Sequence, residues 1–272
     1  MTDQQTLRQY VETWHLACAD FADLARQVPE EQWGLATDLP GWSVKDVVAH
    51  IAHLEFVMAG GAEEPGDETA RTAGPGSRSA HYTERGVVAR RGRTMPELVD
   101  EIEAAVEQRY AELRANPPTD PSAAAAKTPG GIGWDTATLL SNRPLDVWMH
   151  EQDIRRAIDR PGGFDSPAAT HAVGVFSRAL PMVVGKRVAP PAGTSVLVTI
   201  PDAGVRSTVR VGEDGRAKPT REITDPDAEL SMSSEAFVIL AGGRRRPDQV
   251  EVQIEGDADL GARVLESLAV TP

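Results

Sequence analysis

The sequence predicts an α+β fold in which a four-helix bundle precedes a smaller α/β domain. Apolar residues recur at helical spacing through roughly the first 160 residues, which is the pattern of amphipathic helices. After Gly163 the pattern changes to short runs of alternating apolar and polar residues, which are typical of strands. The turn-forming segment "RPGG" separates the two patterns. We therefore expect a helical bundle over residues 1–162 and an α/β domain over residues 163–272.

Capping residues set the expected ends of the helices in the first domain. Ser43, with Asp46 three residues later, forms a capping-box pattern, and so does Thr94 with Glu97. The expected helices cover residues 3–28, 43–59, 94–116 and about 144–158. The Gly-rich and polar segment 60–93 and the segment 117–134 are expected to be long loops, and four amphipathic helices with two long connections favour a bundle.

The second domain is expected to combine three strands with three helices. The run "VEVQI" alternates apolar and polar residues in the manner of a half-buried strand. The expected strands cover 194–200, 207–211 and 250–254, and the expected helices cover about 168–184, "SEAFVILAG" and "DADLGARVLESL".

Composition excludes several classes of protein. A formal charge of -13 and a pI of about 4.9 argue against a nucleic-acid partner, because such binders present a basic face. No apolar run reaches the ~18 residues of a membrane span, and the polar N-terminus lacks a secretory signal pattern, so we expect a cytoplasmic protein. The single cysteine, Cys18, lies among helically spaced apolar residues and is expected to be buried.

Three ionisable residues share one face of the helix expected at 144–158. Asp146, His150 and Asp153 lie at i, i+4 and i+7, within roughly 60° on a helical wheel and between apolar neighbours. On the helix at 43–59, His50 lies at the margin of the apolar arc and Glu55 inside it, whereas His53 lies outside. We therefore expect His50, and not His53, to face the interior of the bundle.

A metal ion would satisfy these groups together. Helical bundles commonly bind metals through carboxylate and His ligands on facing helices, and buried ionisable groups need partners. His50, Asp146 and His150 would give three ligands with an open position, as in catalytic zinc sites, and Asp153 would be a fourth ligand or would orient an imidazole. An Asp–His or Asp–Arg network without metal explains the same pattern, and His50 alone would fit an ordinary core histidine.

The same residues carry a resemblance to a known family. "LPGWSVKDVVAHIAHLE" and "RPLDVWMHEQDIRRAIDRPGG" resemble the mycothiol-dependent maleylpyruvate isomerase family, within the DinB-like metalloenzymes. The stretch from "AELSMSSEAF" to the C-terminus resembles the sterol-carrier-type domain of that family. The resemblance implies that His50, Asp146 and His150 bind a divalent metal, with zinc expected. It departs at Asp146, because the family pattern often has Glu at that position.

The resemblance also implies mycothiol as a cosubstrate. Its metal-bound thiolate would attack an electrophilic substrate, either to isomerise it or to remain attached in an S-transfer. Other readings are a non-enzymatic protein that binds a metal and an apolar ligand, and a metal-assisted hydrolase. The sequence sets no oligomeric state.

An acidic substrate would need cationic partners. The candidates are two arginine clusters, for which a solvated surface is the alternative: Arg90, Arg91 and Arg93, and Arg244, Arg245 and Arg246. Of these, Arg244, Arg245 and Arg90 are also the expected cofactor-binding residues.

Overall fold

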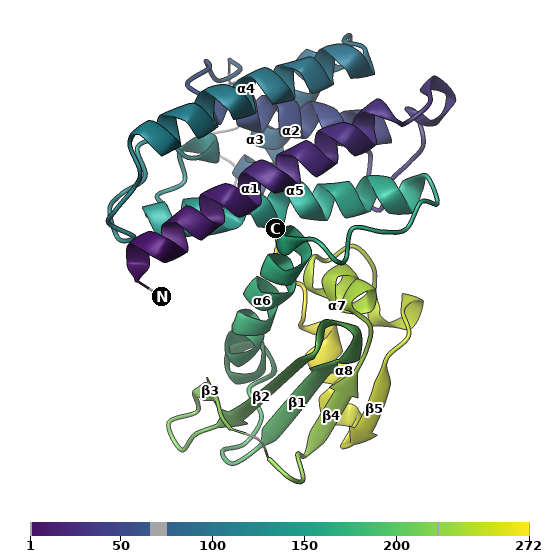
Figure 1. The fold of residues 1–272 in the computed structure, drawn as a ribbon. Coiled ribbons are helices and arrows are strands. Elements are labelled where there is room, and N and C mark those ends of the chain that lie inside the picture. Colours follow the sequence, from purple (N-terminus) through teal and green to yellow (C-terminus); the bar gives the residue numbers. More distant parts are fainter. Residues whose placement is uncertain (1, 66–74, 222, 272) are drawn as a thin grey trace. The chain divides into compact units, whose positions relative to one another are not determined.

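The computed structural model describes residues 2–65, 75–221 and 223–271, and it has the predicted α+β fold (Figure 1). The chain divides into two compact units, Met1–Ala169 and Thr170–Pro272. The expected boundary at 162/163 lies shortly before this division, which falls within the helix α6. Among the described residues, no helix is long and apolar enough to cross a membrane.

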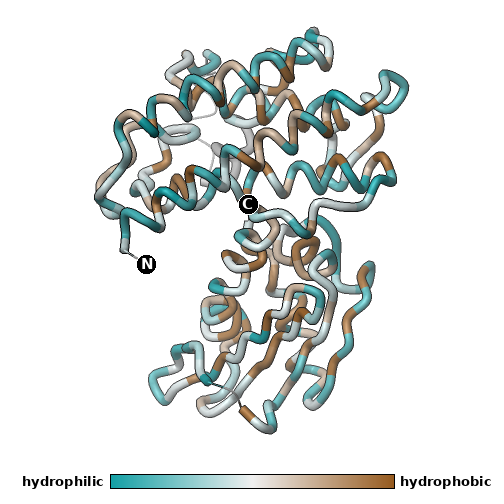
Figure 2. The backbone as a smooth tube through the Cα atoms, viewed as in Figure 1, coloured by the Kyte–Doolittle hydropathy of each residue, from teal (hydrophilic) through white to brown (hydrophobic). Residues whose placement is uncertain are grey.

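Long helices build the first unit. Helices α1 and α5 pack against each other, α2 packs against α4 and α5, and α1 also packs against α4. The apolar faces meet in the middle of the bundle, where Trp14, Phe21 and Ile51 are fully buried. Hydrophobic and hydrophilic stretches alternate along these helices, as amphipathic helices require (Figure 2). The helices of this unit are α1 (Asp3–Arg26), α2 (Val44–Met58), α3 (Pro75–Arg90), α4 (Met95–Ala115) and α5 (Thr136–Ala157).

The expected capping boxes begin two of these helices. The Ser43 hydroxyl accepts a hydrogen bond from the Asp46 backbone N–H, and the Asp46 carboxylate accepts one from the Ser43 backbone N–H. Thr94 and Glu97 make the same reciprocal pair at the start of α4. Both predictions are confirmed by these hydrogen bonds. Each motif stabilises its helix because it satisfies backbone N–H donors that have no partner inside the helix.

Two predictions about the bundle are wrong. Part of the segment expected to be a loop over 60–93 forms the helix α3, which packs on α2 and buries Val87 completely. The last bundle helix begins at Thr136, capped by Asp135, and continues through Pro144. Proline removes one backbone donor, but the surrounding helices hold this segment in place, so tertiary packing overrides the local preference for a helix start at Pro144.

A five-stranded sheet forms the centre of the second unit. Its order is β3-β2-β1-β4-β5, in which β1 and β4 are parallel and the other neighbours are antiparallel. Two of the expected strands are present, and the third is shifted toward the C-terminus; β3 and β4 are too short for the sequence pattern to have shown them. The strands are β1 (Ser195–Ile200), β2 (Val205–Val211), β3 (Ala217–Pro219), β4 (Ala228–Ser231) and β5 (Gln253–Gly256).

The three expected helices of the second domain are present. Helix α8 lies against β4 and β5, and its Gly261 allows this approach, because an added Cβ would lie 2.6 Å from Ile254 Cγ2. The helices are α6 (Pro167–Met182), α7 (Ser234–Ala241) and α8 (Ala258–Glu266).

Candidate metal centre

Three side chains from two helices converge inside the first unit. His50 comes from the middle of α2, and Asp146 and His150 come from successive turns of α5. His50 Nε2 lies 3.9 Å from Asp146 Oδ2, and His150 Nε2 lies 3.7 Å from Asp146 Oδ1. These distances are too long for hydrogen bonds, so the three groups face one another without being bonded together.

The geometry and chemistry of this trio fit a metal ion. One ligand atom from each residue lies within 4.8 Å of the other two. Atoms that bind the same zinc ion, each at ~2.0–2.2 Å, lie roughly 3–4 Å apart, so only small shifts are needed. His50 Nδ1 is buried without a hydrogen-bond partner among the described residues, so the His50 ring has no strong bond that would resist such a shift.

Burial leaves the trio open on one side. His50 and His150 are 3% and 6% exposed, whereas the Asp146 side chain is 24% exposed. Within the described part of the chain, the carboxylate is therefore the member of the trio most accessible to solvent.

The ionisation states of two of these groups suit metal binding, which requires neutral imidazoles and an ionised carboxylate. Burial, together with the nearby His150, lowers the pKa of His50 to about 3. Burial would raise the pKa of Asp146, but Arg143 and the two histidines outweigh it and lower the pKa to about 2. At neutral pH, His50 is uncharged and Asp146 is a carboxylate.

Asp153 lies behind His150. Its Oδ2 is 3.0 Å from His150 Nδ1, and its Oδ1 accepts a 2.6 Å hydrogen bond from Arg156. Arg156 also donates to Asp38, in the loop that precedes α2. Because Asp153 contacts the ring nitrogen that faces away from Asp146, its position favours orientation of His150 over direct metal binding.

Two residues at this centre were not expected from the sequence. The Trp42 ring lies 5.0 Å from the His50 ring and 6.2 Å from the His150 ring, measured between centroids, and its Nε1 donates to Glu84 of α3. Arg143 donates a 2.9 Å hydrogen bond from Nη1 to Asp146 Oδ2. The spacing of Arg143, one turn before Asp146, was a signal available in the sequence. The spacing gave no such signal for Trp42, because its hydrogen-bond partner Glu84 lies on α3, which was not expected.

The prediction that His53 faces away from the interior is wrong. His53 is 1% exposed, and its Nδ1 lies 3.3 Å from Arg90 Nη1. Helix α3 covers this side of α2, and Gly86 lies directly against the His53 ring. His53 is not part of the group of ligand atoms that lie close together, so of the two histidines only His50 contributes to the trio.

Arg90 is also buried, at 2% exposed. Its guanidinium bonds Glu101 through two nitrogens and Glu64 through the third. Arg91 and Arg93 form ion pairs near the surface. Cofactor binding by Arg90 stays a prediction, and it would require these ion pairs to open.

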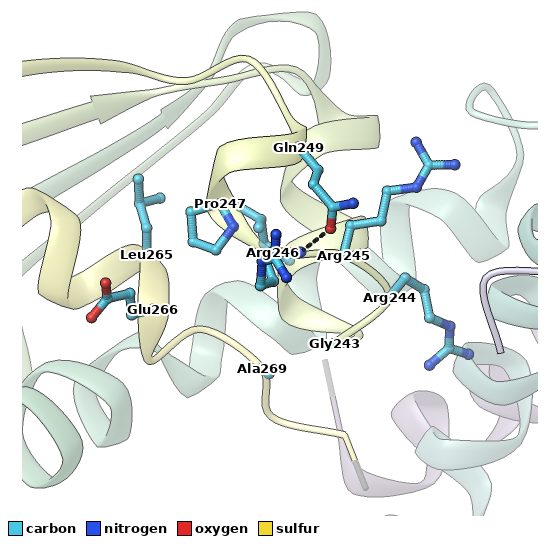
Figure 3. Close-up of a pocket in the computed structure, with 10 residues that line it drawn as sticks. Gly243, Arg244, Arg245, Arg246, Pro247, Gln249, Leu265, Glu266 and Ala269 are labelled. Atoms are coloured by element: carbon cyan, nitrogen blue, oxygen red, sulfur yellow. Dashed lines mark hydrogen bonds between the residues drawn. The ribbon is translucent and has the colours of Figure 1, made fainter. Parts of the chain in front are cut away.

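The second arginine cluster lines a cavity of about 310 Å³ in the second unit. Arg244, Arg245 and Arg246 follow α7, and Leu265 and Glu266 of α8 form the other wall. Arg244 and Arg245 extend to the side away from Leu265 (Figure 3). The Arg246 backbone N–H donates a hydrogen bond to Gln249 Oε1, and the Arg246 guanidinium pairs with Asp248. The lining thus carries three arginines and one carboxylate, that of Glu266.

Cys18 is buried as expected, at 1% exposed. Burial raises the pKa of its thiol well above the ordinary value, so it is not a reactive thiolate.

Each of the two units matches a known protein-family model. Residues 14–155 match the family model of the mycothiol maleylpyruvate isomerase N-terminal domain, and residues 170–263 match the model of the C-terminal domain of the same proteins. No curated protein sequence matches this chain significantly.

Two solved structures share the fold. They are crystal structures of a mycothiol-dependent maleylpyruvate isomerase and of a mutant of it, each with a TM-score of 0.58 and 17% sequence identity. The match covers 93% of this chain and 96% of each of those chains.

Proposed function

The chain belongs to the mycothiol maleylpyruvate isomerase family, and we propose that it is a metal-dependent isomerase that uses mycothiol as a cosubstrate. The observation that carries the proposal is the convergence of His50, Asp146 and His150, in which the carboxylate is more exposed than the two imidazoles. Two imidazoles and one carboxylate with an open position are typical of catalytic zinc sites, so we propose Zn²⁺ as the ion.

The protein residues prepare this centre in distinct ways. His50, Asp146 and His150 would hold the ion, Asp153 would fix the ring orientation of His150, and the Trp42 ring lies near both imidazoles. A bound divalent cation favours the thiolate form of a coordinated thiol at neutral pH. Since Cys18 is buried with a raised pKa, the reacting sulfur must come from the cosubstrate.

In the proposed reaction, the thiolate of mycothiol would add to an activated carbon–carbon double bond of the substrate. The electron pair of that bond moves onto the adjoining carbonyl, and the remaining single bond can rotate. Return of the electron pair expels the thiolate and leaves the isomer, so the thiol is not consumed. If a proton reached the carbon instead, the sulfur would stay attached and the reaction would be an S-transfer.

We propose Arg244 and Arg245 as partners for an acidic group of the substrate or of the thiol. Guanidinium groups bond carboxylates through two nitrogens, and these two arginines lie at a cavity large enough for a small molecule.

Metal analysis tests the ligand assignment. Purified protein is expected to contain one metal ion per chain, and His50→Ala and His150→Ala are expected to lose it. His15→Ala is the matched control, because His15 lies on α1 against Tyr110 and outside the trio. Full metal content in both ligand variants would rule out the assignment.

Activity is tested with maleylpyruvate, with and without mycothiol. Turnover that requires mycothiol and leaves its concentration unchanged supports isomerisation, whereas loss of free thiol with an electrophile supports S-transfer. Metal-loaded protein that turns over neither maleylpyruvate nor a panel of electrophiles would contradict the proposal and favour a non-enzymatic metal-binding role.

A further inference from the structure

We propose that Arg143, held in place by the buried Glu55, is a positioning residue that fixes the carboxylate of Asp146 for metal binding. The inference rests on the proposed function, since it concerns a ligand of the same centre. It goes further by assigning a role to a buried charge network that the ligand set does not include.

Glu55 forms the fixed end of this network. It lies on α2 and is 0% exposed. Its Oε1 accepts hydrogen bonds from Arg143 Nε at 3.1 Å, from Arg143 Nη2 at 2.6 Å and from Trp14 Nε1 at 3.1 Å. Its Oε2 lies 3.5 Å from Arg109 Nη1. These bonds come from α1, α4 and α5, so Glu55 is tied to three helices besides its own.

Arg143 transmits this fixed position to the metal ligand. It is 1% exposed, and two of its nitrogens bond Glu55 while the remaining nitrogen, Nη1, bonds Asp146 Oδ2 at 2.9 Å. A guanidinium is planar and rigid, so fixing Nε and Nη2 also fixes the direction of Nη1. The coupling of charges is strong here, because Glu55 and Asp146 raise the pKa of Arg143 against the opposing effect of burial.

Asp146 needs such a restraint more than the two histidines do. Its side chain is the most exposed of the three ligands, at 24%, and a solvated carboxylate has freedom to turn outward. The bond from Arg143 holds Oδ2 on the side of His50, and this leaves Oδ1 on the side of His150. The carboxylate plane is thereby kept between the two imidazoles.

Arg109 provides a control that distinguishes the positioning of Asp146 from the loss of any buried positive charge. It is buried at 6% and contacts the same Glu55, but it stacks over the Trp14 ring and has no contact with Asp146 among the described residues. The substitutions Arg143→Met and Arg109→Met therefore remove the same group from the same buried network, and only the first removes the bond to Asp146.

The test is metal affinity, measured on the full chain by competition between the protein and a chromophoric zinc chelator. Arg143→Met is expected to weaken zinc binding by about 10–100-fold, the usual effect of removing a partner of a metal ligand. Arg109→Met is expected to change the affinity by less than about threefold. Circular dichroism and urea unfolding show whether each variant is folded. If Arg143→Met does not fold, Arg143→Lys replaces it, because one ammonium keeps the charge but cannot bond both carboxylates in the same fixed geometry.

A second comparison distinguishes positioning from a structural effect. In an Asp146→Ala background, Arg143→Met is expected to cause no further loss of affinity, since the carboxylate through which it acts is gone. Cobalt(II) provides a spectroscopic readout: its visible absorption should change with Arg143→Met and stay unchanged with Arg109→Met, because only the former alters a ligand.

Two results would overturn the inference and leave the proposed function intact. The first is a folded Arg143 variant with unchanged zinc affinity. The second is an equal loss of zinc affinity on Arg143→Met in the presence and in the absence of Asp146. If the wild-type protein itself binds no metal, the proposed function fails first, and the positioning role fails with it.

Discussion

At the scale of single residues, the candidate centre depends on groups that lie behind the three ligands. His150 has Asp153 at its second nitrogen, and Asp146 has Arg143 at one of its oxygens. His50 has no such partner among the described residues and is held by burial beneath Trp42. The two histidines are therefore oriented by different means, one by a hydrogen bond and the other by packing.

We expect Asp153→Asn to weaken zinc binding by about tenfold, because an amide is a poorer acceptor for the His150 N–H and no longer favours the tautomer that binds through Nε2. Isothermal titration with zinc measures the change. Glu151→Gln is the matched control: Glu151 is equally buried on the same helix but bonds Arg155 and not His150. Equal affinities for the Asp153 variant and the wild type would contradict this role.

A pH effect is expected from His53. Burial and the neighbouring Arg90 lower its pKa to about 4, whereas an unfolded histidine titrates near ~6.5. Between these values the unfolded chain binds more protons than the native chain, so the free energy of unfolding decreases as the pH falls through this window. His53→Gln removes this contribution, so its free energy of unfolding should fall by about 1–2 kcal/mol less than that of the wild type between pH 7.5 and pH 5.

Urea unfolding at the two pH values measures this difference. The comparison uses the change with pH and not the absolute stability, because the substitution also alters packing. The same decrease in both proteins would show that His53 is protonated equally in the native and unfolded states.

At the scale of elements, the helix α3 changes the surroundings of α2. Its residues are polar and Gly-rich, so their pattern favoured a loop, yet the helix covers the His53 side of α2 and positions Glu84 to bond Trp42. The amphipathic pattern of α2 by itself predicts that one side of the helix faces water. Once α3 is present, His50 and His53 are both buried, His50 beside Asp146 of α5 and His53 beside Gly86 of α3.

The contact between α3 and α2 predicts a strong effect for Gly86→Ala. A Cβ at this position would lie 2.1 Å from His53 Cδ2, so either the ring or the helix must move. Overpacking of this kind costs about 1–3 kcal/mol, which exceeds the gain of up to ~1 kcal/mol from replacing glycine by alanine within a helix. Thermal unfolding checks this. Gly92→Ala is the control, since no atom lies within 4 Å of its added Cβ. A Gly86→Ala protein as stable as the control would mean that α3 does not pack as described.

At the scale of the whole molecule, the chain combines two units with separate cores. All three candidate ligands, together with Asp153, Arg143 and Glu55, belong to the first unit, whereas the arginine-lined cavity belongs to the second. Metal binding is therefore expected to stabilise the first unit directly, because a ligand stabilises the state that binds it.

Zinc at a hundredfold excess over its dissociation constant is expected to raise the free energy of unfolding by about 2.7 kcal/mol. Differential scanning calorimetry with and without a chelator measures this, and His50→Ala should abolish the response. A zinc-dependent shift that persists in the variant would place the binding site elsewhere.

The sequence by itself indicated the α+β class, four of the helices of the first unit, the capping boxes at Ser43 and Thr94, and the three candidate ligands. Each of these depends on local spacing: helical periodicity places Asp146 and His150 on one face, and capping needs only residues that are neighbours along the chain. Tertiary structure decided what depends on contacts between distant segments. Helix α3 buries His53, the bundle holds α5 together through Pro144, and Glu55 of α2 orients Arg143 of α5. Such contacts join residues far apart in sequence, and no local pattern encodes which distant partner a buried charge will meet.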